Sequence, residues 1–408
     1  MRPLRRRPVQ LGVGTVRLSA LEKRLVRRVL ESNRLSYGPF TRRFENRVAR
    51  LHDRRYGIFM NSGTSALQVA LHALKETRGW SDGDEIIVPA LTFVATVNVV
   101  LQNGLRPVFV DVEPAYYGLD PARLAAALTP RTRGIIPVHV FGQPCDMAPV
   151  ASFAKSRGLA IVEDSCETMF ARYRGKPVGS FGDVACFSTY AAHILVTGVG
   201  GIAITDDDEL AVTMKSLANH GRDAIYTSMD DDRVRDDADL FRIVSRRFSF
   251  IHVGYSYRAT ELEAALGLGQ LARWRAFVRR RQANAKRLTS ALRPLAHVLQ
   301  LPRVRPGSEH AFMMYPIVLA DGVDREAVVR HLEHYRIETR YMLPLLTQPI
   351  YRRLFGDIAP NYPNAYRIDR QGFYVGCHPD VTARDIEYVA AVLTDYFVAS
   401  KTRRQRSA

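Results

Sequence analysis

Short runs of β-branched and aromatic residues alternate with helical patterns over residues 55–206. Each run ends at a polar residue, a Gly or a Pro, which is typical of strands in α/β domains. The expected strands are Ile58–Met60, Glu85–Pro89, Pro107–Val112, Gly134–Val140, Ala160–Asp164, Asp183–Thr189 and Gly201–Thr205. The expected helices between them include Ser65–Leu74, Thr96–Gln102, Pro121–Ala127 and Met147–Ser156. Because these strands are apolar throughout, the pattern predicts a large α/β domain whose mostly parallel seven-stranded sheet is covered on both faces.

The remainder of the chain predicts a connecting helix and a smaller domain. Residues 207–260 are polar and mixed in charge, which indicates an exposed helix and loop. Residues 261–296 have the apolar spacing of one long helix with a basic outer face. Beyond it, strands and amphipathic helices indicate an α+β domain, from His310–Ala320, Arg325–Tyr335, Gln371–Cys377 and Ala383–Ser400. The expected divisions are a basic N-terminal helical segment packed on the large domain (1–55), the large domain (56–260), the connecting helix (261–296), the small domain (297–400) and a basic, frayed tail (401–408).

The formal net charge of +17 first suggests a nucleic-acid-binding protein. Residues 1–55 hold sixteen Lys and Arg against four Asp and Glu, and residues 401–408 hold four Lys and Arg with no acid. The two ends therefore carry +12 and +4, which leaves a net charge of +1 for residues 56–400. Since the basic excess belongs to the two ends, we expect no nucleic-acid partner.

Cysteine spacing and hydropathy exclude several other classes of protein. The four cysteines, at positions 145, 166, 186 and 377, form no CxxC pair, so neither a disulfide framework nor a zinc site is indicated. No stretch of eighteen apolar residues occurs, and the Arg-rich start has no apolar region of a signal peptide. We therefore expect a cytoplasmic protein with no metal and no membrane partner.

Small and hydroxyl residues in NSGTSAL (Asn61–Leu67) stand where the first strand passes into a helix. A helix N-terminus with free N–H groups, and a Gly that permits close approach, suits a phosphate. Ser and Thr are also favoured there as helix caps with no ligand. Taken alone, this motif favours the cap.

Polar and aromatic residues follow further strand ends. Asp164 closes the strand Ala160–Asp164, at the carboxyl edge where α/β sheets bind ligands. It could pair with the protonated ring nitrogen of a pyridoxal cofactor, or simply cap a loop. Phe93 could stack on a flat cofactor or lie in the core. Ser188 could contact a phosphate, while His193 in isolation is more typical of a structural histidine.

Ten stretches in one order, over about residues 10–398, strongly resemble the DegT/DnrJ/EryC1/StrS sugar aminotransferase family. They are SYGPFTRRFE, NSGTSALQVAL, GDEIIVPALTFVAT, PVFVDV, GIIPVHVFGQPCDM, IVEDSCE, GSFGDVACFSTY, GVGG, HGRD and GYSYRATELEAALGLGQL. The resemblance implies the aspartate-aminotransferase-like fold, pyridoxal-phosphate (PLP) fold type I. It also implies an enzyme of nucleotide-sugar biosynthesis for deoxysugars or polysaccharides, with a nucleotide-linked keto-sugar substrate, L-glutamate as amino donor and a homodimer with shared active sites.

The resemblance assigns cofactor contacts to five residues of this chain. It makes Gly63 and Thr64 phosphate-binding residues, with Ser188 as a second phosphate contact. Phe93 becomes the residue that stacks on the cofactor ring. Asp164 becomes the partner of the pyridinium nitrogen.

Two further polar residues depart from the family pattern, and three others are possible contacts of the substrate. Glu167 stands where the family usually has a Gln near the cofactor's phenolic oxygen. Ser256 stands where the family commonly has an Asn that reaches the cofactor phosphate of the neighbouring subunit; Ser keeps a donor but has shorter reach. Residues that could contact the sugar nucleotide, or instead serve as caps or loop residues, are His220, Arg222 and His378.

The most informative departure is His193. Aminotransferases of this family have at this position the Lys that binds the cofactor covalently, and His cannot form that bond. The similar 4-keto-6-deoxy-sugar 3-dehydratases have His here and hold pyridoxamine phosphate (PMP) noncovalently. The sequence therefore favours a 3-dehydratase with His193 as the base. The alternatives are an aminotransferase-like enzyme acting on a keto-sugar nucleotide, and a catalytically silent homologue that binds cofactor or sugar.

Other departures bear on the cofactor and the substrate. One branch of these dehydratases holds an iron–sulfur cluster whose first ligand matches Cys166, but the positions of further ligands, residues 224–226, read Ala-Ile-Tyr. We therefore expect no iron–sulfur cluster, and a filler role for Cys166. Val199 replaces a Glu near the reacting centre, and Leu346 replaces a His that could touch substrate.

Overall fold

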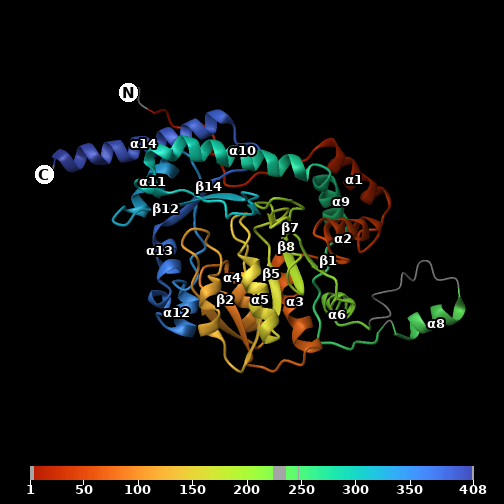
Figure 1. Ribbon diagram of the computed structural model, residues 1–408. Helices are drawn as coiled ribbons and strands as arrows, with labels where there is room; N and C mark the ends of the chain where they lie inside the picture. The colour runs from red at the N-terminus through yellow and green to blue at the C-terminus, as the bar shows by residue number, and fades with distance from the viewer. Residues whose placement is uncertain (1–3, 224–235, 247, 407–408) are drawn as a thin grey trace.

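The computed structural model describes residues 4–223, 236–246 and 248–406, the last eight by their backbone only. Two sheets organise the chain, a larger one in the body of the molecule and a smaller one beneath the long helix α10 (Figure 1). No helix among the described residues is long and apolar enough to span a bilayer.

The larger sheet has the strand order β1-β9-β8-β5-β4-β2-β3. Its strands are β1 (Tyr56–Met60), β2 (Glu85–Pro89), β3 (Arg106–Val110), β4 (Thr132–Ile135), β5 (Ala160–Asp164), β8 (Val184–Ser188) and β9 (Gly201–Thr205). Only β9 runs antiparallel to its neighbours, so the expected mostly parallel seven-stranded sheet is confirmed. The strand expected to reach Val140 ends at Ile135, because Pro137 has no N–H for a regular ladder.

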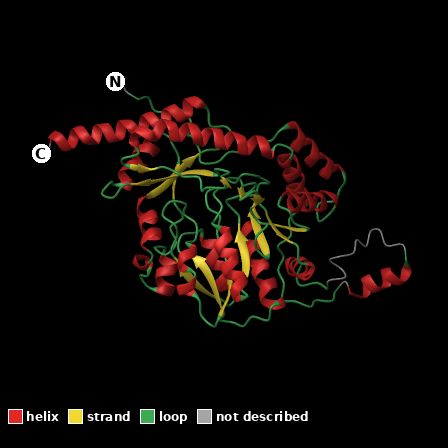
Figure 2. Ribbon diagram, in the orientation of Figure 1, coloured by secondary structure: helices red, strands yellow, loops and turns green. Residues whose placement is uncertain are grey.

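Helices cover both faces of this sheet (Figure 2). In β2, Ile86 and Val88 belong to the main core with helix α3, whereas Ile87 belongs to a separate core with helix α5, as the alternation of side chains along a strand requires. The helices of this domain are α3 (Gly63–Thr77), α4 (Val94–Gln102), α5 (Met147–Arg157), α6 (Asp208–Ala218) and α8 (Asp237–Arg246). The helical stretch expected over residues 121–127 consists of two short 3-10 helices, Pro121–Arg123 and Ala125–Ala127, rather than one α-helix.

The single connecting helix expected over residues 261–296 is also wrong, because the chain breaks into α9 (Glu261–Leu271) and α10 (Trp274–Leu292). Arg273 leaves helical geometry at φ −120° and ψ 4°. The break lets α9 pack against α1 (Ala20–Glu31) and α2 (Pro39–Leu51), while α10 crosses to the small domain. The Glu261 carboxylate also accepts the N–H of Phe40 and Thr41 at the start of α2.

The smaller sheet is antiparallel, with the order β10-β12-β14-β13. Its strands are β10 (Leu299–Gln300), β12 (Met314–Leu319), β13 (Thr339–Tyr341) and β14 (Gly372–Gly376), and its helices are α11 (Arg325–His334), α12 (Pro349–Phe355), α13 (Pro363–Gln371) and α14 (Ala383–Arg406). A three-stranded sheet combines β6 (Arg172–Tyr173) and β7 (Lys176–Pro177) of the large domain with β11 (Ser308–Glu309) of the small domain.

The two ends of the chain differ from the expectation in one respect each. The N-terminal segment does pack on the large domain through α2, but Leu11 also pairs with Ile337 of the small domain. The basic tail is not frayed throughout, because α14 continues to Arg406.

Candidate active site

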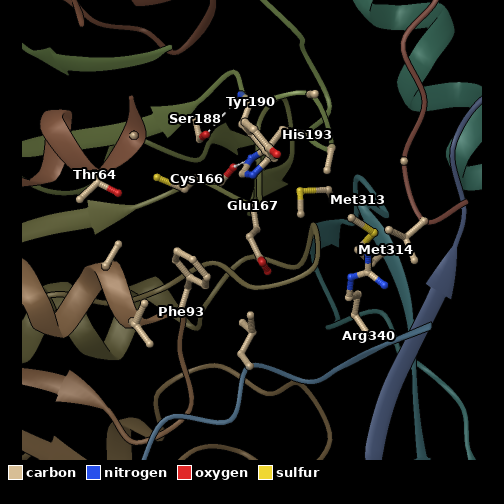
Figure 3. Close-up of a pocket in the computed structure, with 18 of the residues that line it drawn as sticks. Thr64, Phe93, Cys166, Glu167, Ser188, Tyr190, His193, Met313, Met314 and Arg340 are labelled. Carbon is tan, nitrogen blue, oxygen red and sulfur yellow. Dashed lines mark hydrogen bonds between the residues drawn. The ribbon is translucent and has the colours of Figure 1, made fainter. Parts of the chain in front are cut away.

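A cavity of about 990 Å³ opens where the carboxyl ends of the large-sheet strands face the small domain (Figure 3). Seven of the eight candidate catalytic and cofactor-binding residues from the sequence line it: Gly63, Thr64, Phe93, Asp164, Glu167, Ser188 and His193. They come from four separate strand ends and their following segments. The fold thus brings distant motifs to one place, as parallel α/β topology does.

The N-terminus of α3 forms one wall of the cavity. Ser62 caps this helix, since its hydroxyl accepts the N–H of Ser65 at 3.0 Å, so the cap interpretation of the motif holds. Gly63 and Thr64 of the first turn line the cavity together with Ser188. A Cβ on Gly63 would lie 2.8 Å from the Ser188 Cβ and 2.8 Å from the Cys166 Sγ, so only Gly permits this close approach. The arrangement offers helix N–H groups and two hydroxyls to an anion.

Asp164 lies at the floor of the cavity and is 4% exposed. Its Oδ2 accepts the hydroxyl of Thr96 at 2.8 Å, and its Oδ1 accepts the N–H of Cys166 at 3.1 Å. Burial raises the pKa of this carboxyl, and these hydrogen bonds only partly offset the effect. A cationic ring nitrogen at this place would therefore stabilise the carboxylate.

Phe93 precedes α4 and presents its ring to the cavity, where 57% of the residue is exposed. A flat ligand that stacks on such an exposed ring would remove apolar surface from water, which favours binding. The core alternative considered from the sequence does not match this exposure.

Glu167 is a cavity-lining carboxyl whose protonation changes near neutral pH. Burial raises its pKa to about 7, opposed by the N–H of Phe141, which Oε2 accepts at 3.0 Å, and reinforced by the charge of Asp164. When protonated, the carboxyl can donate a hydrogen bond, as the Gln usual at this position does.

Replacing Glu167 by Gln is expected to stabilise the protein at pH 8 but not at pH 4.5. Because the folded-state pKa is raised, the folded protein holds a proton that the unfolded chain releases, so wild-type stability falls as pH rises from 4.5 to about 7. The gain in free energy of unfolding at pH 8 is about 1–3 kcal/mol. Denaturant unfolding of both proteins at the two pH values measures it, and an equal difference at both would contradict the shift.

His193 lies in the segment between β8 and β9 and lines the cavity beside Tyr190 (Figure 3). Its Nδ1 is 2.5 Å from the carbonyl oxygen of Cys166. Because a carbonyl only accepts, Nδ1 carries the proton and Nε2 keeps its lone pair. Burial lowers the pKa of His193 to about 4, with the Arg281 charge acting in the same direction and the Cys166 bond against it. The imidazole is therefore neutral at pH 7.

One candidate cofactor contact and the three candidate substrate contacts from the sequence do not line the cavity. Ser256 accepts a hydrogen bond from Arg258 at 3.0 Å, and the same guanidinium lies 3.1 Å from the Nε2 of His220. Arg222 stacks on exposed aromatic rings after α8. His378 is buried, with its Nε2 3.1 Å from the carbonyl oxygen of Gly12.

Two further residues, one that lines the cavity and one directly behind it, were not among the candidates from the sequence. Thr96, which holds Asp164, is in the quoted PALTFVAT stretch four residues after Thr92, its buried partner at 2.7 Å. Arg340 of β13 is the only Arg or Lys among the described residues that line the cavity. It donates to the carbonyl of Thr339 and to the carboxylate of Glu338, and no motif of the sequence analysis contained it.

Of the two residues that replace a family Glu and a family His, one lines the cavity and the other does not. Val199 lines the cavity and is 50% exposed, whereas Leu346 is buried in the core and does not line it. Cys166 lines the cavity, and burial raises the pKa of its thiol. Residues 224–226 lie outside the described residues, and no cluster of three His, Cys, Asp or Glu in the described part could hold a metal ion. The absence of an iron–sulfur cluster stays a prediction.

The donor set of the cavity fits a pyridoxal-type cofactor. A helix N-terminus with two hydroxyls suits its phosphate, an exposed ring suits stacking, and a buried carboxyl with a raised pKa suits its ring nitrogen. No Lys occurs among the described residues of the lining, so a covalent lysine link is not part of this set.

The model of the DegT/DnrJ/EryC1/StrS aminotransferase family matches residues 17–394. The chain belongs to this family. It is 35% identical to a GDP-perosamine synthase of Caulobacter vibrioides, over 95% of this chain and 99% of the relative. It is 36% identical to a dTDP-4-dehydro-2,6-dideoxy-D-glucose 3-dehydratase of Saccharopolyspora spinosa, over 90% of this chain and 82% of the relative.

Among solved structures, the fold is similar to an E. coli GDP-4-keto-6-deoxy-D-mannose-3-dehydratase with bound hydrated PLP, with a TM-score of 0.85 and 26% identity over 94% of this chain and 99% of that one. The family and the fold class implied by the resemblance are thus confirmed. The protein is an enzyme of a PLP-dependent family that contains both sugar aminotransferases and dehydratases.

Proposed function

We propose that this enzyme is a 3-dehydratase of a nucleotide-linked 4-keto-6-deoxyhexose, with noncovalent PMP as cofactor and L-glutamate as amino donor. The observation that carries the proposal is a neutral imidazole, His193, at the place of the family's cofactor-binding Lys, with an unshared Nε2 lone pair. When bound, the cofactor supplies an amine that condenses with the sugar ketone and a ring that delocalises electrons.

The residues of this chain would divide the remaining tasks. Thr64, Ser188 and the first turn of α3 would bind the cofactor phosphate, and Phe93 would hold the ring flat. Asp164 would keep the ring nitrogen protonated. His193 Nε2 would accept the proton from C4′ of the cofactor and then donate it to the departing C3 hydroxyl of the sugar.

A guanidinium on the outer wall, which is paired with Glu338 in this structure, supports an anionic substrate. Arg340 is a charge-assisted donor on the small-domain side of the cavity, opposite the α3 N-terminus that suits the cofactor phosphate. The relatives named above carry GDP- and dTDP-linked sugars in their names, and we propose a nucleotide-linked sugar here. Its diphosphate supplies the anion that such a guanidinium recognises.

We also propose a homodimer with shared active sites. Ser256 and His220 lie outside the cavity of their own chain, beside a surface with several exposed apolar side chains, Phe241, Phe248, Phe250, Ile251 and Val253. Such a surface is typical of an interface. In the dimer, Ser256 would reach the partner's cofactor phosphate, and Arg222, which stacks on Phe248 and Phe250, would lie at the same interface. A sedimentation mass of one 46.0 kDa chain would contradict this proposal.

Absorbance of the purified protein with PLP, before and after addition of glutamate, tests the proposed function. We expect bound cofactor that borohydride does not trap on a lysine, and a shift from the aldehyde to the amine form with glutamate. With a 4-keto-6-deoxy sugar nucleotide, the amine form should release ammonia and a 3-deoxy product.

Two results would overturn the proposed function, each in favour of a different alternative. An amino sugar formed without ammonia would indicate an aminotransferase. Failure to bind cofactor at all would indicate a silent homologue.

A further inference from the structure

Arg281 is a buried cation one layer behind the wall of the candidate active site. It belongs to α10 and is 2% exposed. The other basic residues of this helix are exposed: Arg275, Arg279, Arg280, Lys286 and Arg287. The third Arg of the run 279–281 therefore departs from the solvent-facing basic surface expected of this helix.

The acceptors of Arg281 are backbone carbonyl oxygens. Its Nη1 lies 2.7 Å from the oxygen of Met313 and 3.4 Å from that of Phe312, and its Nη2 lies 3.4 Å from the oxygen of His193. Within the described part of the chain, Arg281 forms no ion pair, and its Nε has no hydrogen-bond partner. A buried charge without an acidic partner is costly, and an apolar side chain would fill the same space at lower cost.

These neighbouring carbonyls belong to different domains, which meet at this side of the cavity. His193 belongs to the segment between β8 and β9 of the large domain, and Met313 lies just before β12 of the small domain (Figure 3). Both residues also line the cavity. One rigid guanidinium thus joins the backbone of the candidate base to the backbone of the small domain.

We propose that Arg281 is a positioning residue that fixes the backbone of His193 against the small domain and thereby sets the direction of the imidazole Nε2. This inference rests on the proposed role of His193. Backbone placement matters because a base displaced by about 1 Å from its proton loses on the order of a hundredfold in rate. The hydrogen bond from Nδ1 to Cys166 fixes one side of the ring, and Arg281 fixes the chain that carries it.

Several titratable groups surround His193. Cys166 and Glu167 face it from the segment after β5, with Asp164 at the end of that strand, Tyr190 from its own segment and Arg281 from α10. Among these, Arg281 is the cation, and its charge disfavours the imidazolium. Removing Arg281 should therefore change the titration of His193 as well as its position, which the loss of a purely structural residue elsewhere would not do.

The test compares Arg281→Met, which removes charge and donors, with Arg281→Lys, which keeps the charge, and with Arg279→Met, an exposed control on the same helix. Histidine-labelled NMR of the cofactor-free full chain reports the tautomer and titration of His193, with its signals assigned from His193→Asn. We expect wild type and Arg279→Met to stay neutral and Nδ1-protonated down to pH 5. In Arg281→Met the titration midpoint should rise by about one pH unit, and in Arg281→Lys the signals should broaden or shift without that rise.

A second readout uses the loaded enzyme. The rate of the glutamate-driven conversion of bound PLP should fall about 10–100-fold in Arg281→Met, while cofactor affinity changes less than threefold, because Arg281 touches none of the residues proposed to hold the cofactor. Unchanged His193 signals in a folded Arg281→Met, or in Arg281→Lys if the Met variant does not fold, would overturn the inference. The NMR test needs no sugar substrate. Its result can therefore be interpreted even if the protein does not catalyse the proposed dehydratase reaction.

Discussion

Substituting Asn for His193 is expected to slow the glutamate-driven conversion of bound PLP and the release of ammonia by about 10²–10⁴-fold, the usual contribution of a general base. Asn can still donate from its amide to the Cys166 carbonyl, but it has no lone pair that accepts a proton near neutral pH. Cofactor affinity should change little, because His193 is not part of the proposed phosphate or ring-nitrogen contacts. Stopped-flow absorbance measures the rate, and equilibrium titration with PLP measures the affinity.

The control for this substitution is His297→Asn, at an exposed histidine that lies outside the cavity. Full dehydration by His193→Asn would remove His193 from the role of base. His193→Lys adds an independent readout, since we expect it to bind PLP covalently and to become sensitive to borohydride. Failure of a folded, PLP-binding Lys variant to form that bond would show that position 193 does not reach the carbon that the family's Lys reaches.

Substituting Asn for Asp164 is expected to weaken PLP binding and to slow conversion of the cofactor, each by about 10²-fold or more. Asp164 is buried, and its replacement keeps the volume but removes the only charge proposed to pair with the ring nitrogen. Removing one partner of a buried, hydrogen-bonded charge pair costs about 3–5 kcal/mol, which corresponds to a loss of this size or larger. Absorbance titration with PLP and single-turnover kinetics measure the two effects.

A graded series separates charge from hydrogen bonding at this position. Thr96→Val removes the hydroxyl that donates to Asp164 at 2.8 Å and should cost about 0.5–1.5 kcal/mol, hence at most about tenfold in affinity. Asp357→Asn, at an exposed carboxylate away from the cavity, should leave PLP affinity unchanged. Equal losses of PLP affinity in Asp164→Asn and Thr96→Val would contradict the proposal that the Asp164 charge pairs with the ring nitrogen.

The sequence predicted the large sheet well because its strands are apolar on both faces. Five-residue runs such as Glu85–Pro89 and Ala160–Asp164 are matched by the observed strands, since a buried strand leaves a continuous apolar pattern. The break between α9 and α10 was missed because the apolar spacing continues through residues 272–273. The spacing of apolar residues hardly changes between the two helices. In the sequence they therefore resemble one long helix, although they pack on different neighbours.

The candidate site likewise contains residues that the sequence predicted and residues that it did not. Gly63, Asp164 and Ser188 stand at strand ends, and strand ends of a parallel sheet meet at one edge, so their convergence followed from the sequence. Arg340 belongs to a short strand of the small domain, where nothing in the local pattern relates it to that edge. His378 seemed equally polar in the sequence, but the fold buries it against Gly12 instead.

The sequence by itself determined the fold class, the family and the replacement of the cofactor-binding Lys by His193, because these depend on residue identity and order. Only the tertiary structure decided how that imidazole is protonated, because the tautomer depends on the carbonyl of Cys166, which lies 27 residues away in the chain. It also decided that Arg281, one Arg in a basic run, is buried against the backbone of His193. Burial and hydrogen-bond partners arise from packing between distant segments, and the pattern along a single helix does not contain them.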